Sequence, residues 1–258
     1  MEHGITSMST ALVKVGCGQA SAALIKQATL FAPLPSALLE KLQLSFKVIE
    51  WKKGQYINAK RLTEYFYILL DGQVEFKQVN FDTAREANVD MFYAGDSFDI
   101  MVLLDAKPHE VIIVPLMTAR LLSVPIETMR HWIWTYPDLN NQFLPYLAQK
   151  MRDKEEQATS LILHDTSTRL SRLILKHVKK SVDYRGTKKC AHCDHLVNGL
   201  NDETLARMIG SVRQIVNKQL RHWQAQGILD KKRNQLIIHD LEALAREAHL
   251  TQKLLPDK

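Results

Sequence analysis

The sequence predicts an α+β protein in which a strand-rich first half is followed by a long helix and a basic, mainly helical last third. Between about residues 46 and 124, short runs of β-branched and aromatic residues alternate with turn signals, which is typical of antiparallel strands. Between about residues 138 and 163, apolar residues recur every four positions, as in an amphipathic helix. The formal net charge is +6 and is concentrated near the C-terminus, which suits a polyanionic partner.

The strand-rich region predicts an antiparallel sandwich or barrel. Its first part is expected to follow a helix over residues 29–44, while residues 1–28 are weakly patterned. Asp71-Gly72 lies between two strand-like runs and predicts a hairpin there. The predicted strands cover residues 46–51, 56–58, 65–70, 74–79 and 111–122.

The long helix is expected over residues 138–163. Its apolar stripe comprises Leu139, Phe143, Leu147 and Met151. We expect one face of this helix to pack on the barrel and another to pair with the same helix of a second subunit; packing on its own barrel alone is the alternative.

Asp165 follows the long helix as a predicted N-cap. It opens a further helix that passes through Leu173, Ile174 and Val178. We place the domain boundary at Asp165.

The segment 200–220 predicts two helices joined by a tight turn. Asn201 can cap the first helix, and Asp202 and Glu203 favour its positive end. Leu205 and Ile209 are spaced to face inward, the small Ala206 permits close helix crossing, and Gly210 permits a left-handed turn residue. On the second helix, the predicted buried side comprises Val212, Val216 and Leu220.

Long polar donors occupy the other side of the second helix. A recognition helix places such side chains near its N-terminus, where they meet base edges in the major groove. Arg pairs with guanine, and Gln or Asn with adenine, whereas Lys and Arg also hold phosphates. The predicted DNA-binding residues are Arg213, Gln214, Asn217, Lys218 and Arg221.

A basic hairpin is expected after these helices. Gly227-Ile228-Leu229 begins one strand and Leu236-Ile237-Ile238 forms the returning strand. The turn between them contains the predicted wing residues Lys231, Lys232 and Arg233. Two helices and a basic hairpin predict a winged helix-turn-helix; an ordinary helical hairpin with a charged face is the alternative.

The chain resembles the Crp/Fnr family of bacterial transcription regulators over about residues 29–245. The segment 200–220 aligns with that family's helix-turn-helix without gaps. The run 65–74 looks like the family's early hairpin, and Gly95-Asp96-Ser97-Phe98 looks like its later glycine turn. The resemblance implies an N-terminal antiparallel β-roll or jelly-roll effector domain with a cyclic-nucleotide-binding-like fold, a dimerisation helix and a winged helix-turn-helix.

The resemblance also implies function. It implies a homodimer bound to double-stranded DNA at a pseudo-palindromic site, with half-sites about one helical turn apart, and contact with RNA polymerase. The recognition positions carry over as Arg213, Gln214, Asn217 and Lys218. Gln214 departs from the glutamate of many relatives, so a different consensus site is expected, and Gln219 is polar where relatives have an apolar residue.

The effector is unknown. Cyclic-nucleotide binders of the family use a Gly-Glu pair and, about ten residues on, an Arg followed by Ser or Thr. Here Phe98-Asp99 and His109-Glu110 occupy these positions. A buried phosphodiester needs a fixed cation and donors, so the sequence argues against cyclic AMP and cyclic GMP.

Metal and redox chemistry have one candidate segment. Two cysteines and two histidines fall within six residues, where they can bind zinc or form a redox disulfide; an exposed loop without a cofactor is the alternative. These residues are Cys190, His192, Cys193 and His195. An Fnr-type iron–sulfur cluster needs four cysteines and the chain has three, while zinc and haem stay open as cofactors.

The sequence thus predicts a regulator and no enzyme, since no Gly-rich phosphate loop, nucleophile elbow or paired catalytic carboxylates occur. We expect a cytoplasmic protein, because three cysteines are too few for a disulfide scaffold and suit a reducing compartment, and because the N-terminus lacks a secretory signal. We expect no membrane partner, because no apolar run approaches the roughly 20 residues of a membrane span. An effector-independent or partner-controlled regulator, a thiol-redox or zinc protein built on Cys190 and Cys193, and an interaction module without DNA are the alternatives. The expected divisions are residues 1–28, a sensor at 29–125, a dimerisation region at 126–164 and a DNA-binding domain at 165–258.

Overall fold

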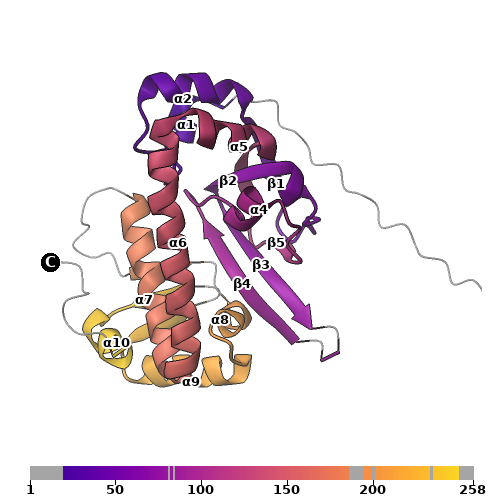
Figure 1. Ribbon diagram of the computed structural model, residues 1–258. Helices are drawn as coiled ribbons and strands as arrows, with labels where there is room; N and C mark the ends of the chain where they lie inside the picture. Colours follow the sequence, from indigo (N-terminus) through magenta and orange to yellow (C-terminus); the bar gives the residue numbers. More distant parts are fainter. Residues whose placement is uncertain are drawn as a thin grey trace, which may run out of the picture.

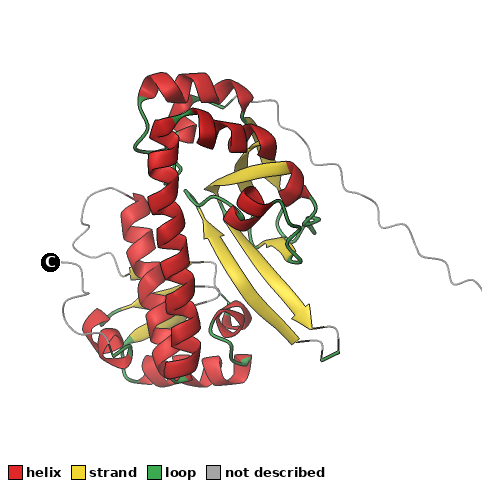
Figure 2. Cartoon of the chain, viewed as in Figure 1, coloured by secondary structure: helices red, strands yellow, loops and turns green. Residues whose placement is uncertain are grey.

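The computed structural model describes residues 20–80, 82–83, 85–185, 195–198, 201–232 and 235–249. The predicted α+β class is confirmed: two antiparallel sheets lie on one side of a long helix, and a smaller module of helices with a third sheet lies at the lower end of that helix (Figures 1 and 2). Among the described residues, no helix combines the length and apolar character needed to cross a membrane.

Two three-stranded antiparallel sheets form the N-terminal half. Their strand orders are β1-β6-β2 and β4-β3-β5. The strands are β1 (Lys47–Trp51), β2 (Tyr65–Asp71), β3 (Gln73–Asn80), β4 (Arg85–Tyr93), β5 (Ile112–Pro115) and β6 (Ala119–Pro125).

The predicted hairpin at Asp71-Gly72 is wrong. Only Gly72 separates β2 from β3, and the two strands pair in different sheets. Gly72 has φ +103°, and a Cβ atom there would lie 2.8 Å from the Cα of Ala119. A strand pair joined by a tight turn needs two loop residues, so this glycine instead forms a corner at which the chain passes from one sheet to the other.

Other strand predictions need correction. Residues 56–58 form no strand, and Ile57 makes only an isolated bridge with Ile113. The run 111–122 is divided into β5 and β6, because residues 116–118 turn between the two sheets. The sequence analysis missed β4, which pairs along β3 and has a polar, partly exposed sequence.

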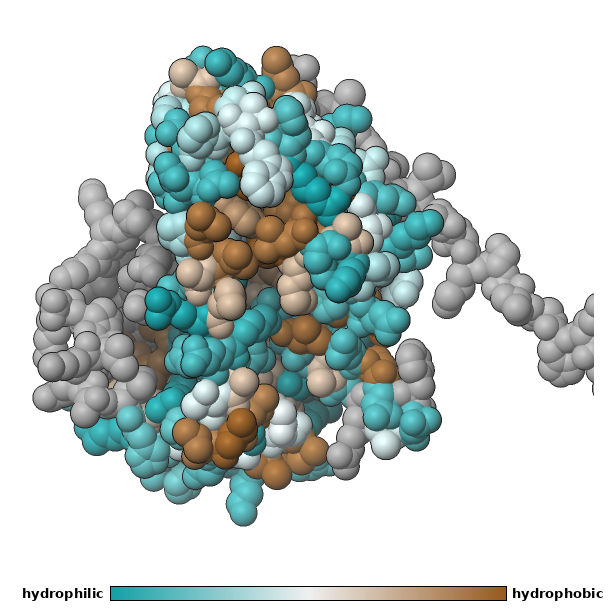
Figure 3. All heavy atoms as spheres, viewed as in Figure 1, coloured by the Kyte–Doolittle hydropathy of each residue, from teal (hydrophilic) through white to brown (hydrophobic). Residues whose placement is uncertain are grey.

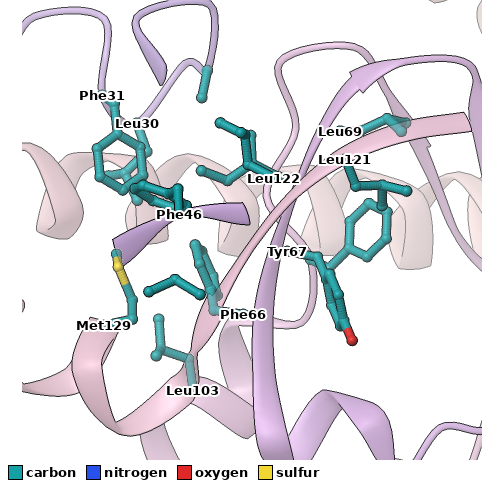
Figure 4. Close-up of a cluster of buried hydrophobic side chains, with 14 of the residues drawn as sticks. Leu30, Phe31, Phe46, Phe66, Tyr67, Leu69, Leu103, Leu121, Leu122 and Met129 are labelled. Atoms are coloured by element: carbon teal, nitrogen blue, oxygen red, sulfur yellow. The ribbon is translucent and has the colours of Figure 1, made fainter. Parts of the chain in front are cut away.

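Short helices surround the sheets. The helix expected over 29–44 is confined to α2, since turns occupy the part around Pro33 and Pro35. The apolar side chains of that region are nevertheless buried, and Leu30 and Phe31 lie in one cluster with Phe46, Leu122 and Met129 (Figure 4). These helices are α1 (Ala22–Ile25), α2 (Ser36–Leu42), the 3-10 helix η1 (Gln43–Ser45), α3 (Arg61–Glu64), α4 (Ile100–Asp105) and α5 (Ile126–Thr135).

Helix α6 (Pro137–Leu163) confirms the predicted long helix. Leu139 and Phe143 are buried in the core of the strand-rich half, whereas Met151 is 64% exposed, so the stripe leaves the sheets halfway along the helix. Lys150 Nζ lies 3.0 Å from Asp96 Oδ1 and ties the helix to the turn after β4. Burial opposes the charge of Lys150, but Asp96 outweighs it and raises the pKa of Lys150.

Asp165 caps the next helix as predicted. Its carboxylate accepts a hydrogen bond from the Thr168 N–H at 2.8 Å, and Thr168 thereby lowers the pKa of Asp165. Leu170, Ile174 and Val178 enter a second core, separate from that of the strand-rich half. The C-terminal elements are α7 (Thr166–Arg185), β7 (His195–Asn198), α8 (Asp202–Met208), α9 (Arg213–Ala225), β8 (Leu229–Lys232), β9 (Gln235–Ile238) and α10 (Leu241–Glu247).

Candidate nucleic-acid interface

Helices α8 and α9 form the predicted helix pair. Asn201 caps α8, since its side chain accepts a hydrogen bond from the Thr204 N–H at 2.8 Å. Leu205 and Ile209 are buried, as expected from their spacing. Gly210 has φ +60°, and a Cβ atom there would lie 3.0 Å from Leu161 at the end of α6. The turn glycine therefore provides a left-handed residue and also a close approach to the long helix.

One face of α9 fixes it in the module. Val216, Leu220 and Trp223 have no exposed surface and pack in the C-terminal core. The prediction that Val212 is also buried is wrong: it is the N-cap residue of α9 and is 53% exposed. Its extended backbone places it outside the helical pattern that buries Val216 and Leu220.

The predicted recognition side chains occupy the remaining surface of α9. Arg213, Gln214, Lys218 and Arg221 are exposed, and Asn217 is half-buried. Arg213 and Gln214 are the first two residues of the helix. Three positive charges and two amides are thus presented together from one helix whose opposite face is held by the core.

The predicted wing is an antiparallel hairpin of β8 and β9. Lys232 is exposed, but Lys231 Nζ lies 2.5 Å from Asp202 Oδ2 in α8. Asp202 is buried, so this ion pair fixes the wing on the first helix and takes Lys231 partly out of the free basic surface. Arg233 lies outside the described residues.

Strand β7 adds a third strand to the wing sheet, in the order β7-β9-β8. His195 is the first residue of β7, and its backbone is in register with Ile238. The other members of the metal or redox candidate, Cys190, His192 and Cys193, lie outside the described residues.

In the strand-rich half, the two positions compared with a cyclic-nucleotide site contact each other. His109 Nδ1 lies 2.8 Å from Asp99 Oδ2, and Asp99 has a left-handed backbone (φ 43°) and caps α4. The hydrogen bond with Asp99 raises the pKa of His109 despite its partial burial. Phe98 directly precedes Asp99 in the chain, and its ring centroid lies 4.5 Å from that of Phe92 and 5.6 Å from that of Phe76.

The sequence analysis missed an ion pair between the two halves of the chain. Arg207 in α8 donates two hydrogen bonds to Glu75 in β3, from Nε to Oε1 at 2.9 Å and from Nη2 to Oε2 at 2.8 Å. Glu75 is only 1% exposed. The available signal was a carboxylate between the apolar residues Val74 and Phe76, although nothing in the sequence names its partner 132 residues away.

Comparison with known proteins agrees with this arrangement. Residues 168–247 match the family model of the Crp-like helix-turn-helix domain. A relative from Mycobacterium tuberculosis, a CRP-like cAMP-activated global transcriptional regulator, is 22% identical over 227 residues, which are 87% of this chain and 98% of the relative.

Two solved structures show the same fold at low identity. The c-di-GMP responsive global regulator CLP of Xanthomonas campestris has a TM-score of 0.63 at 17% identity, covering 80% of this chain and 99% of its own. FixK2 from Bradyrhizobium japonicum has a TM-score of 0.64 at 15% identity, covering 78% of this chain and 96% of its own. Residues 168–247 thus belong to the Crp-like helix-turn-helix domain family, and over most of its length the chain is similar to transcription regulators of the Crp/Fnr type in sequence and in fold.

Proposed function

We propose that this regulator binds a pseudo-palindromic duplex DNA site as a homodimer and responds to a signal other than a cyclic nucleotide. The observation that supports it most is α9, which exposes Arg213, Gln214, Lys218 and Arg221 while Trp223 and its neighbours hold its other face in a core. A fixed helix with long donors at its N-terminal end has the form that the major groove accepts.

Within this proposal each predicted DNA contact has a role. Arg213 and Gln214, at the start of α9, read base edges, and Asn217 assists them from its half-buried position. Lys218 and Arg221 hold phosphates, as does the exposed wing residue Lys232. We keep the divisions at residues 29–125, 126–164 and 165–258 for sensing, dimerisation and DNA binding.

Helix α6 supports a homodimer. Apolar residues gather on the face of the molecule along which α6 runs (Figure 3). The exposed stripe advances by steps of four and three residues, the spacing at which two helices pair side by side. Its two alanines permit close approach. The stripe comprises Leu144, Ala148, Met151, Glu155, Ala158 and Ile162.

The Asp99–His109 pair supports an effector other than a cyclic nucleotide. Asp99, at the position compared with the family's glutamate, is already hydrogen-bonded to His109, at the position compared with its arginine. A phosphodiester entering there would have to displace a carboxylate from the histidine and would gain no guanidinium. The alternative is a regulator that is controlled by a protein partner or has no effector. In either case we propose that the regulator contacts RNA polymerase and acts in the cytoplasm.

Equilibrium binding to a random-sequence duplex tests DNA binding. We expect affinity to fall steeply as salt rises, because phosphate-bound counterions are released. Lys218→Gln should weaken binding to every sequence and lower the magnitude of the slope of log K against log salt by about one. Absence of binding at low salt would overturn the proposal.

Sedimentation tests the dimer. Met151→Lys introduces a charge at the centre of the exposed α6 stripe and should yield monomers at concentrations where the wild type is dimeric. Arg152→Lys, at the neighbouring exposed position outside the stripe, is the matched control and should stay dimeric. A wild-type protein that sediments as a monomer would refute the homodimer.

A further inference from the structure

Arg207 lies in a cage of three carboxylates. Besides the two hydrogen bonds to Glu75, its Nη1 lies 3.7 Å from Glu86 in β4 and 3.4 Å from Glu203 one turn earlier in α8. Asn88 Nδ2 donates to Glu75 Oε1 at 3.3 Å and so orients the acceptor. A bidentate guanidinium–carboxylate contact has a fixed geometry, which a single surface ion pair lacks.

Burial makes this contact costly to open. The side chain of Glu75 is 1% exposed and that of Arg207 is 15% exposed. Burial opposes the charge of Arg207, yet the hydrogen bonds and negative charge of Glu75 raise its pKa above the ordinary value. Separating the pair would leave a carboxylate inside the sheet without its cation, a state that is strongly unfavourable unless water or a ligand reaches it.

Further contacts also link the two halves, including an ion pair in which Lys176 Nζ of α7 lies 3.9 Å from Asp153 Oδ1 of α6. Only His164 and Asp165 connect α6 to α7. The β3–β4 strand pair also contacts α7, where the Tyr93 hydroxyl bonds His177, and α6, where Lys154 Nζ lies 3.0 Å from Asp90. In Figure 1 this strand pair extends towards α8, the first helix of the DNA-binding module.

We propose that Glu75 and Arg207 are positioning residues that hold the helix-turn-helix on the β3–β4 strands in an orientation competent for DNA binding. The ion pair involves a residue of α8, and when it is formed Arg213, Gln214 and Lys218 on α9 remain exposed. Formation of the Glu75–Arg207 pair therefore leaves the DNA-binding side chains of α9 accessible.

This inference rests on the proposed DNA binding, and it makes an opposite prediction from a direct role of Arg207. If Arg207 held a DNA phosphate, removing Glu75 would free its charge and strengthen binding. If the pair positions the module, removing either partner lowers the competent fraction and weakens binding in proportion. The two explanations also differ in salt dependence, because only a lost phosphate contact changes the slope.

The test measures duplex affinity against salt for the full-length wild type, Glu75→Gln, Arg207→Gln and Arg207→Lys. We expect both glutamine variants to bind about tenfold more weakly with an unchanged salt slope, and the lysine variant to recover part of the affinity. Arg246→Gln removes an exposed charge from α10 and serves as the matched control. Amide hydrogen exchange of α8 should be faster in the glutamine variants, while the β1–β6–β2 sheet should keep its protection.

Three outcomes would contradict the assignment. Stronger DNA binding by Glu75→Gln would show that Arg207 contacts a DNA phosphate or that the ion pair inhibits DNA binding. Equal affinity of wild type and Arg207→Gln shows that the pair has no positioning role. A wild type that binds no duplex overturns the proposed function and this inference together, and so is distinguished from failure of the inference alone. If the glutamine variants do not fold, Arg207→Lys must still show weaker binding at an unchanged salt slope.

Discussion

The helix-turn-helix and the strand-rich half differ in which polar groups they leave exposed. In the helix-turn-helix, polar groups that could bind a partner are exposed: Arg213, Gln214 and Lys218 point away from a core closed by Trp223. In the strand-rich half, two polar groups bond each other instead, since Asp99 is bonded to His109 beside packed phenylalanine rings. The polar groups of α9 are therefore available to a partner, whereas Asp99 and His109 are bonded to each other.

The largest expected effect tests whether the two regions are separate folding units. Trp223→Ala removes the largest fully buried side chain of the C-terminal core and should cost about 3–5 kcal/mol. Because Trp51 belongs to the other core, Trp51→Ala should instead destabilise the sheets. Hydrogen exchange of each region would measure both effects. Equal loss of protection everywhere in both variants would mean that the two cores unfold as one unit.

Base preference sharpens the account of the exposed region. Arg213→Ala should cost about 1–3 kcal/mol at one base position, because a bidentate contact to guanine is lost. Gln214→Glu should move the preference at its position from adenine towards cytosine, since a carboxylate accepts and an amide also donates. Affinity measured across all single-base changes of a selected site would check both. A uniform loss for Arg213→Ala would reassign it to phosphate binding.

A substitution at the boundary between the regions is expected to change stability by a smaller amount. Asp165→Ala removes the N-cap of α7 and should destabilise the C-terminal module by about 1 kcal/mol. Asp165→Asn keeps an accepting oxygen at the cap and is the control that should retain most of this stability. Thermal unfolding of the two variants gives the comparison, and identical stabilities would remove the capping role.

The smallest expected effect concerns the Asp99–His109 pair of the strand-rich half. The pKa of His109 is raised above its ordinary value of 6.5 mainly by its hydrogen bond with Asp99, so the protonated form stabilises the fold. This stabilisation is complete below pH 6.5 and is lost as the pH rises through the folded-state pKa. His109→Gln should flatten that part of the stability profile measured by denaturant unfolding. An unchanged profile would show that the pair does not titrate in this range.

Local chemistry explains which features the sequence could predict. The Asn201 cap, the Gly210 turn and the buried spacing of Val216 and Leu220 depend on residues within a few positions, and all were predicted. Val212 was mispredicted because helix periodicity does not extend to an N-cap residue.

Long-range features were not predictable in the same way. Asp71-Gly72 has the composition of a hairpin turn, but the position of Ala119 decides that the chain turns a corner there. The pairs Glu75–Arg207 and Asp202–Lys231 join residues far apart in sequence, and a charged residue alone does not reveal its partner. The resemblance to the family suggested how the parts are ordered, but it did not indicate these contacts between individual side chains.

Selection of bound sequences from a random duplex library tests the central claim most directly. If α9 reads the major groove in a homodimer paired through α6, the enriched sequences should contain inverted repeats whose half-site centres lie about 10 base pairs, one helical turn, apart. Arg213→Ala should lose the preference at one symmetric pair of positions within those repeats. Enrichment without inverted symmetry, or no enrichment over the starting library, would contradict the account.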